Sequence, residues 1–229
     1  MLSFGCNMKD IFLLDMDETL LDFLKAEEEN FLWALHRFGV QTDARTYPRF
    51  HEINDGLWKM LERGEIARAE INYRRFELLF QEFGYRADFK AVASAYFKHF
   101  EEVCYPYPGA IVFLKALKER GRTYIVTNGS KPIQERHIAD AGFLSLIEGA
   151  FISEDVGFNK PSKEYADYVK ANIEGFENSR AVWIGDSLTS DMVCAQNAQV
   201  DFILYSPTGR PQGYGGELAR NYDELLQLL

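Results

Sequence analysis

Two aspartates, Asp15 and Asp17, directly follow the apolar run IFLL in the segment IFLLDMDETLL. A short, continuous apolar run is typical of a strand covered on both faces, whereas carboxylates are rarely buried without a partner. The pair therefore predicts a charged site at the end of this strand, where partners of opposite charge offset the two carboxylates.

Polar residues also end or follow three later apolar segments. Thr127 and Asn128 come after TYIV, Lys160 comes shortly after GAFIS, and Asp186 comes after AVWIG, with Asp191 five positions further on. Each motif alone could be a helix cap, a turn or a solvated loop. Ligands of open α/β sheets bind beyond the carboxyl ends of the strands, so their joint occurrence favours one shared site.

The elements that must position these residues can be predicted from the alternation of strand-like and helix-like segments in residues 106–229. Strands are predicted for TYIVTNG, GAFIS, AVWIGD and DFILY, and helices for AIVFLKALKERG, KPIQERHIADAG, SKEYADYVKANI, LTSDMVCAQNAQ and the terminal GGELARNYDELLQLL. The glycine-containing stretch 206–216 is predicted to be a surface loop. Strands that alternate with helices of these lengths predict an α/β protein with a Rossmann-like, doubly wound parallel sheet.

Between the first two strands the chain carries only helical patterns. Phe31, Leu35 and Phe38 have helical spacing before Gly39, and IARAEINYRRFELLFQEFG forms a second apolar stripe. The acidic run 27–29 is expected on a solvated helix face.

YPYPG then interrupts the helical pattern, because prolines do not continue a helix. We therefore expect a core domain of residues 1–22 and 106–229, and an inserted all-helical cap domain of residues 23–105.

Composition limits the classes of partner. The chain has 229 residues, a formal charge of −10 and a pI near 5.0, which opposes binding to a nucleic-acid polymer. Cys6, Cys104 and Cys194 form neither a disulfide framework nor a zinc motif. The start of the sequence lacks a secretory or membrane-spanning pattern. A cytoplasmic protein that does not bind membranes is expected, as a monomer or homodimer.

Together, DMDET, Thr127, Lys160 and GDSLTSD resemble the motifs of the haloacid dehalogenase superfamily, and the helical insert lies where that family places a cap. The resemblance implies that Asp15 is the nucleophile, which forms an aspartyl-phosphate, and that Asp17 is the general acid and base. It implies that Thr127, the backbone N–H of Asn128, and Lys160 bind the phosphoryl group.

Charge repulsion explains why such a site needs a metal. A phosphate dianion beside two carboxylates makes four unit-charge pairs, which amount to about 16 kcal/mol of repulsion at 4 Å and an effective dielectric of 20. Mg²⁺ is expected on Asp15, the backbone carbonyl of Asp17 and Asp186. Asp191 is expected to hold a metal-bound water or to orient Lys160.

A narrower resemblance is to the pyrimidine nucleoside 5′-monophosphatases, carried by DMDETLLDF, NDGLWKMLERGEI, YPYPGA and ISEDVGFNKPSKEYADYV. It implies hydrolysis of UMP, dUMP and dTMP, which are small phosphate monoesters. Trp58, Asn54 and Arg63 could contact the base, although helix packing is the more common role of such residues.

Two other functions stay open. One is a phosphatase or mutase for phosphoglycolate or a small sugar phosphate. The other is a non-catalytic binding protein on the same fold. Four histidines lack metal-ligand spacing and are expected at helix surfaces or interfaces: His36, His51, His99 and His137.

Overall fold

The structure is a computed structural model that describes residues 8–229. Cys6 and the start of the chain, for which the sequence predicts no targeting segment, lie outside the described residues. The described chain divides into two compact units. One unit extends to Asp22 and resumes at Pro106, and the other is Phe23–Tyr105.

The first unit contains a six-stranded sheet in the order β3-β2-β1-β4-β5-β6, in which every pairing is parallel. Its strands are β1 (Ile11–Leu14), β2 (Arg122–Thr127), β3 (Gly149–Ile152), β4 (Ala181–Gly185), β5 (Asp201–Tyr205) and β6 (Glu217–Ala219). β1 is fully buried and lies between β2 and β4, as its four apolar residues predict. The predicted fold class is confirmed.

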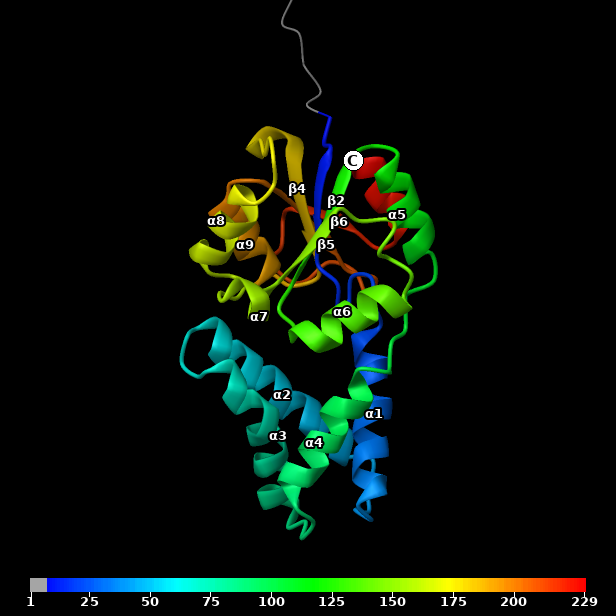
Figure 1. The fold of residues 1–229 in the computed structure, drawn as a ribbon, viewed down its shortest axis with the longest axis vertical. Coiled ribbons are helices and arrows are strands. Elements are labelled where there is room, and N and C mark those ends of the chain that lie inside the picture. The colour runs from blue at the N-terminus through cyan, green and yellow to red at the C-terminus, as the bar shows by residue number, and fades with distance from the viewer. Residues whose placement is uncertain (1–7) are drawn as a thin grey trace, which may run out of the picture. The chain divides into compact units, whose positions relative to one another are not determined.

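Helices cover both faces of this sheet (Figure 1). They are α5 (Ala110–Lys118), α6 (Lys131–Asp140), α7 (Ser153–Val156), α8 (Lys163–Ala171), α9 (Asp191–Ala198) and α10 (Tyr222–Leu228), with the 3₁₀ turn η1 (Asn178–Arg180) before β4. α8 packs on α9 on one side, and α5 packs on α10 on the other. None of the helices in residues 8–229 is long and apolar enough to cross a membrane.

Two expectations for the C-terminal half need correction. The segment GGELARNYDELLQLL is not one helix: residues 217–219 pair with β5 as a sixth strand, and α10 begins only after Asn221, whose side chain accepts from the Glu224 N–H at 2.9 Å. The pairing of this short strand depends on its neighbour, which a local pattern does not reveal. The helix predicted for LTSDMVCAQNAQ is also shorter than expected, since α9 begins at Asp191. The residues before it form a turn in which the Ser187 hydroxyl accepts from the Ser190 N–H.

The second unit consists of four helices, α1 (Phe23–Arg37), α2 (Thr46–Glu62), α3 (Arg68–Phe83) and α4 (Phe89–Phe100). Its core is a contiguous group of rings from all four helices. Phe50 stacks on Phe31 with centroids 4.2 Å apart, and Phe76 lies 5.0 Å from Phe50 and 5.3 Å from Tyr96. Phe38 lies beyond the end of α1 and is exposed rather than part of the predicted stripe.

The prediction of a solvated acidic face on α1 is wrong for Glu27, which is completely buried. Its carboxylate accepts from the Asn54 amide at 2.6 Å, and it lies 2.7 Å from His51 Nδ1. Asn54 also accepts from the buried Arg75 guanidinium at 2.8 Å. Partners on α2, one of which is itself held by Arg75 on α3, therefore stabilise a carboxylate that helical periodicity assigned to solvent.

All four histidines have identified partners or surroundings in the structure. His36 is exposed near the end of α1, and its Nε2 lies 3.2 Å from Thr42 Oγ1. His51 is half-buried beside Glu27, and His99 Nδ1 lies 2.7 Å from Asn30 Oδ1. His137 is buried in α6, so a surface position is wrong for this residue. Cys104 and Cys194 are free thiols.

Candidate active site

The site lies where β1, β2 and β4 end side by side. Asp15 follows β1, and its backbone N–H donates to Ile184 O at 2.9 Å, so the parallel ladder extends to this residue. Thr127 is the last residue of β2, and Asp186 follows the last residue of β4. Strand pairing thus brings together residues more than a hundred positions apart in the sequence.

Lys160 lies at the centre of the site and is only 2% exposed. Its ammonium donates to Asp15 Oδ1 at 2.5 Å, to Asp191 Oδ1 at 2.6 Å and to the backbone oxygen of Val126 at 2.9 Å. All three N–H groups of the ammonium can therefore be satisfied. The lysine holds two carboxylates from different elements in one place.

Asp191, the first residue of α9, is 1% exposed and fixed from several sides. Besides Lys160, it accepts from Trp183 Nε1 at 3.3 Å and from the backbone N–H of Ser187 at 3.2 Å. A Cβ atom on Gly185 would lie 2.3 Å from its carboxylate carbon. The strand end can approach this buried carboxylate because residue 185 has no side chain.

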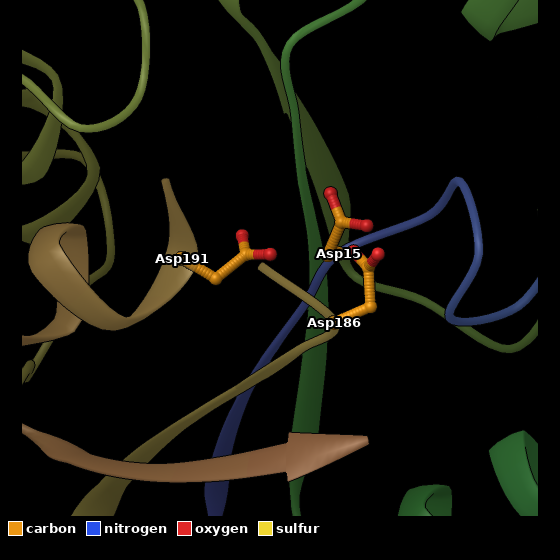
Figure 2. Close-up of side chains that lie close together, drawn as sticks. All are labelled: Asp15, Asp186 and Asp191. Carbon is orange, nitrogen blue, oxygen red and sulfur yellow. The ribbon is translucent and has the colours of Figure 1, made fainter. Parts of the chain in front are cut away.

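The carboxylates of Asp15, Asp186 and Asp191 form a cluster in which one oxygen of each lies within 4.8 Å of the others. Figure 2 shows the three groups, which converge from the ends of β1 and β4 and from the start of α9. Asp186 is exposed, whereas the other two are buried. Three carboxylates around one ammonium leave negative charge uncompensated, and oxygen donors suit a hard cation such as Mg²⁺. The donor set therefore fits the predicted metal.

The surroundings shift the pKa values of these groups. Burial raises the pKa of Asp15 well above its usual value, with contributions from the neighbouring carboxylates and opposition from Lys160. Although the residue as a whole is exposed, desolvation of its carboxyl group by neighbouring protein atoms and the charge of Asp191 raise the pKa of Asp186 to about 7. For Lys160, burial lowers the pKa, but Asp15 and Asp191 outweigh this effect and hold it well above its usual value. The ammonium therefore stays charged.

Asn128 contributes more than the backbone N–H for which the sequence singled it out. Its side-chain amide donates to Lys160 O at 2.8 Å, and its Oδ1 accepts from Lys160 N–H at 2.8 Å. The turn after β2 thus fixes the main chain of Lys160. Thr127, beside it, is 1% exposed at the end of β2.

Asp17 does not belong to the carboxylate cluster, because its side chain interacts with a different element. Its Oδ2 accepts from the amide Nε2 of Gln134 on α6 at 2.9 Å. Gln134 is not among the site residues predicted from the sequence, because nothing in the local pattern of α6 distinguishes this polar residue from its exposed neighbours.

The loop after Asp17 reverses the chain. Glu18 has a left-handed φ of 59°, and its carboxylate accepts from the Tyr107 hydroxyl at 2.9 Å. The Tyr107 N–H also donates to Leu20 O at 2.9 Å. These bonds join the two segments of the sheet-containing unit that lead into and out of residues 23–105.

The three helical-unit residues considered as base contacts have structural partners there. Asn54 belongs to the buried Glu27 and Arg75 chain. Trp58 packs on the aromatic core, and the exposed Arg63 forms an ion pair with Glu65 at 2.5 Å.

Comparisons with known proteins agree with this geometry. Residues 9–199 match the model of the haloacid dehalogenase-like hydrolases. The chain is 34% identical to the HAD-hydrolase YfnB of Bacillus subtilis, over 87% of this chain and 85% of the relative. The magnesium-bound crystal structure of YfnB, which reveals interdomain movement in that protein, superimposes with a TM-score of 0.90, at 32% identity, and covers 96% of this chain and 98% of that one.

Two relatives are named as nucleotidases. Pyrimidine 5′-nucleotidase PynA of Streptococcus pneumoniae is 34% identical over 85% of this chain and 83% of its own. Pyrimidine 5′-nucleotidase YjjG of Escherichia coli is 27% identical over 82% of each chain.

Proposed function

The chain belongs to the haloacid dehalogenase-like hydrolases, and from this membership we propose that it is a Mg²⁺-dependent pyrimidine nucleoside 5′-monophosphatase. The observation that carries the phosphatase chemistry is the buried Lys160, which joins Asp15 to Asp191 beside Asp186. The names of PynA and YjjG support the substrate class.

Asp15 is the nucleophile of the proposed reaction. A carboxylate oxygen of Asp15 forms a bond to phosphorus while the bond from phosphorus to the leaving oxygen breaks, and an aspartyl-phosphate results. Asp17 gives a proton to the leaving oxygen. Asp17 then takes a proton from a water molecule whose oxygen bonds to phosphorus while the bond from phosphorus to the Asp15 oxygen breaks. Phosphate is released, and both residues return to their starting states.

The other residues bind and neutralise the phosphoryl group. Lys160 offsets the charge on Asp15 and on the non-bridging oxygens, while Thr127 and the backbone N–H of Asn128 donate to those oxygens. Mg²⁺ would be held by Asp15, Asp186 and the backbone carbonyl of Asp17, where its charge lowers the repulsion between the nucleophile and the phosphate dianion. Asp191 orients Lys160 through their 2.6 Å contact.

We assign residues 23–105 as the cap that selects the rest of the substrate. Two features support this: the helical unit is inserted between Asp17 and Thr127, and the relative YfnB undergoes interdomain movement. Asp17 itself favours a phosphatase over a dehalogenase, because dehalogenases of the superfamily lack an aspartate at this position.

The test is phosphate release from UMP, dUMP, dTMP, AMP, GMP, phosphoglycolate and glucose phosphates, with Mg²⁺ or with EDTA. We expect Mg²⁺-dependent release from the pyrimidine nucleotides, loss of activity in Asp15→Asn, and normal activity in Asp223→Asn, an exposed aspartate on α10. Activity confined to phosphoglycolate or a sugar phosphate would overturn the substrate class. Failure to release phosphate from any compound would overturn the phosphatase proposal.

A further inference from the structure

We propose that Gln134 is a positioning residue for Asp17, and that it fixes the orientation of the Asp17 carboxyl group relative to the leaving oxygen. The inference rests on the proposed phosphatase chemistry. It starts from one contact, in which Gln134 Nε2 donates to Asp17 Oδ2 at 2.9 Å across 117 positions of sequence.

The packing around Gln134 holds its amide in place. The residue is 4% exposed on α6. A Cβ atom on Gly129 would lie 2.1 Å from Gln134 Nε2 and 2.4 Å from its amide carbon. The amide therefore lies against the backbone of the turn that follows Thr127, and the glycine at position 129 makes this approach possible.

A role limited to fold stability explains this arrangement poorly. Gln134 Oε1 is buried and has no hydrogen-bond partner among the described residues. Burial of an amide with an unpaired carbonyl costs free energy, whereas an apolar side chain of similar shape would avoid that cost. The contact that Gln134 does make is to the carboxylate that the proposed mechanism uses as acid and base.

An amide N–H is suited to a carboxyl group that alternates between two protonation states. It donates to Oδ2 when Asp17 is ionised, and it still donates to Oδ2 when the proton is on Oδ1. A proton on Oδ2 would instead face the amide N–H and remove its acceptor. Gln134 thus holds the Asp17 carboxyl group in one orientation, from which Asp17 gives its proton to the leaving oxygen as the bond from that oxygen to phosphorus breaks and the bond from Asp15 to phosphorus forms.

Leaving-group dependence separates this role from a general structural one. Phenolate needs a proton to leave, whereas 2,4-dinitrophenolate leaves as a stable anion. We would measure kcat/KM for phenyl phosphate and 2,4-dinitrophenyl phosphate, because this parameter reports the first phosphoryl transfer. The variants are Gln134→Glu, which keeps the shape but lacks the amide donor, and Gln134→Leu. The control is Glu135→Gln, an exposed neighbour on α6.

General acid catalysis is worth roughly 10²- to 10⁴-fold, so loss of positioning should lower kcat/KM for phenyl phosphate by about 10- to 100-fold. For 2,4-dinitrophenyl phosphate, kcat/KM should change less than about threefold, and the Glu135→Gln control should match the wild type on both esters. Equal losses on both esters in a folded variant, or no loss on either, would overturn the inference and leave the phosphatase proposal intact. A wild-type protein that hydrolyses neither these esters nor any compound of the nucleotide panel would overturn both.

Discussion

At the scale of single residues, the feature that most constrains the site is the contact of Lys160 with two buried carboxylates. The ammonium is within 2.6 Å of both Asp15 and Asp191, and none of the three side chains is more than 8% exposed. In such surroundings the removal of one partner is costly, because a buried charge then has no counter-charge. Lys160 should therefore support both the fold and the reaction.

We expect Lys160→Met to lower kcat by at least about 100-fold, since the charge on the phosphoryl group is no longer offset. In EDTA, its free energy of unfolding should fall by about 3–5 kcal/mol. Urea unfolding and phosphate release measure the two effects. The control is Lys163→Met, which removes an exposed lysine paired with Asp167 and should change stability by less than about 0.5 kcal/mol.

A double variant separates the two roles of Lys160. Lys160→Met with Asp191→Asn should regain stability relative to Lys160→Met, because one of the two like charges is gone, but it should remain inactive. Unchanged stability in the single variant would contradict the proposal that the lysine is the counter-charge of both carboxylates.

At the scale of elements, the loops that follow the strands are tied to one another. The Asn128 side chain holds both backbone polar groups of Lys160, and so joins the turn after β2 to the segment before α8. From α9, Asn197 donates to the adjacent Pro161 O at 2.7 Å. Both asparagines hold the same segment, but only Asn128 holds the main chain of the lysine itself.

We expect Asn128→Ala to lower kcat about 10-fold or more and to cost about 1–3 kcal/mol of stability, because two buried backbone groups lose their partner. Asn197→Ala is the matched control, with a comparable loss of stability for the bond it removes but nearly normal kcat. Equal kcat losses in the two variants would show that the segment as a whole, rather than the fixed position of Lys160, limits the reaction. Steady-state kinetics measure kcat, and urea unfolding measures the free energy of unfolding.

The strands that contain an apolar run could be predicted from the sequence, and so could the polar residues at their ends. Asp15, Thr127 and Asp186 lie together because parallel strands end at the same edge, which is a general property of such sheets. Gln134 and Glu27 could not be placed in this way. Each is a polar residue in a helical pattern, and its burial depends on partners in other elements, which no local periodicity encodes.

At the scale of the whole molecule, the acidic cluster should link stability to both pH and Mg²⁺. In the metal-free protein, the folded state raises the pKa values of Asp15 and Asp186 above their unfolded values, chiefly because protein atoms desolvate the two carboxyl groups. The folded state therefore binds more protons than the unfolded state between those values. The stabilisation that comes from this extra proton binding is complete below the unfolded pKa values of the two aspartates. It is lost as the pH rises through their folded pKa values, and the folded value is about 7 for Asp186.

Mg²⁺ binds the ionised carboxylates, so it competes with protons and its stabilising effect should grow as pH rises. Mg²⁺ at about 100 times its dissociation constant adds about 2.7 kcal/mol. For a chain of this length, that corresponds to an increase in Tm of roughly 5–10 °C at about pH 8, with a smaller increase at about pH 6. Thermal melts with excess MgCl₂ or EDTA at both pH values measure this increase in Tm.

Asp186→Asn should abolish the Mg²⁺-dependent increase in Tm and should raise the Tm of the EDTA-treated protein at about pH 8, because a neutral side chain replaces a carboxylate that repels its neighbours. Asp223→Asn, which changes an exposed carboxylate on α10 by the same chemistry, should behave like the wild type. An equal Mg²⁺ effect at both pH values, or one that persists in Asp186→Asn, would mean that the ion stabilises the protein from a site other than the cluster of Asp15, Asp186 and Asp191.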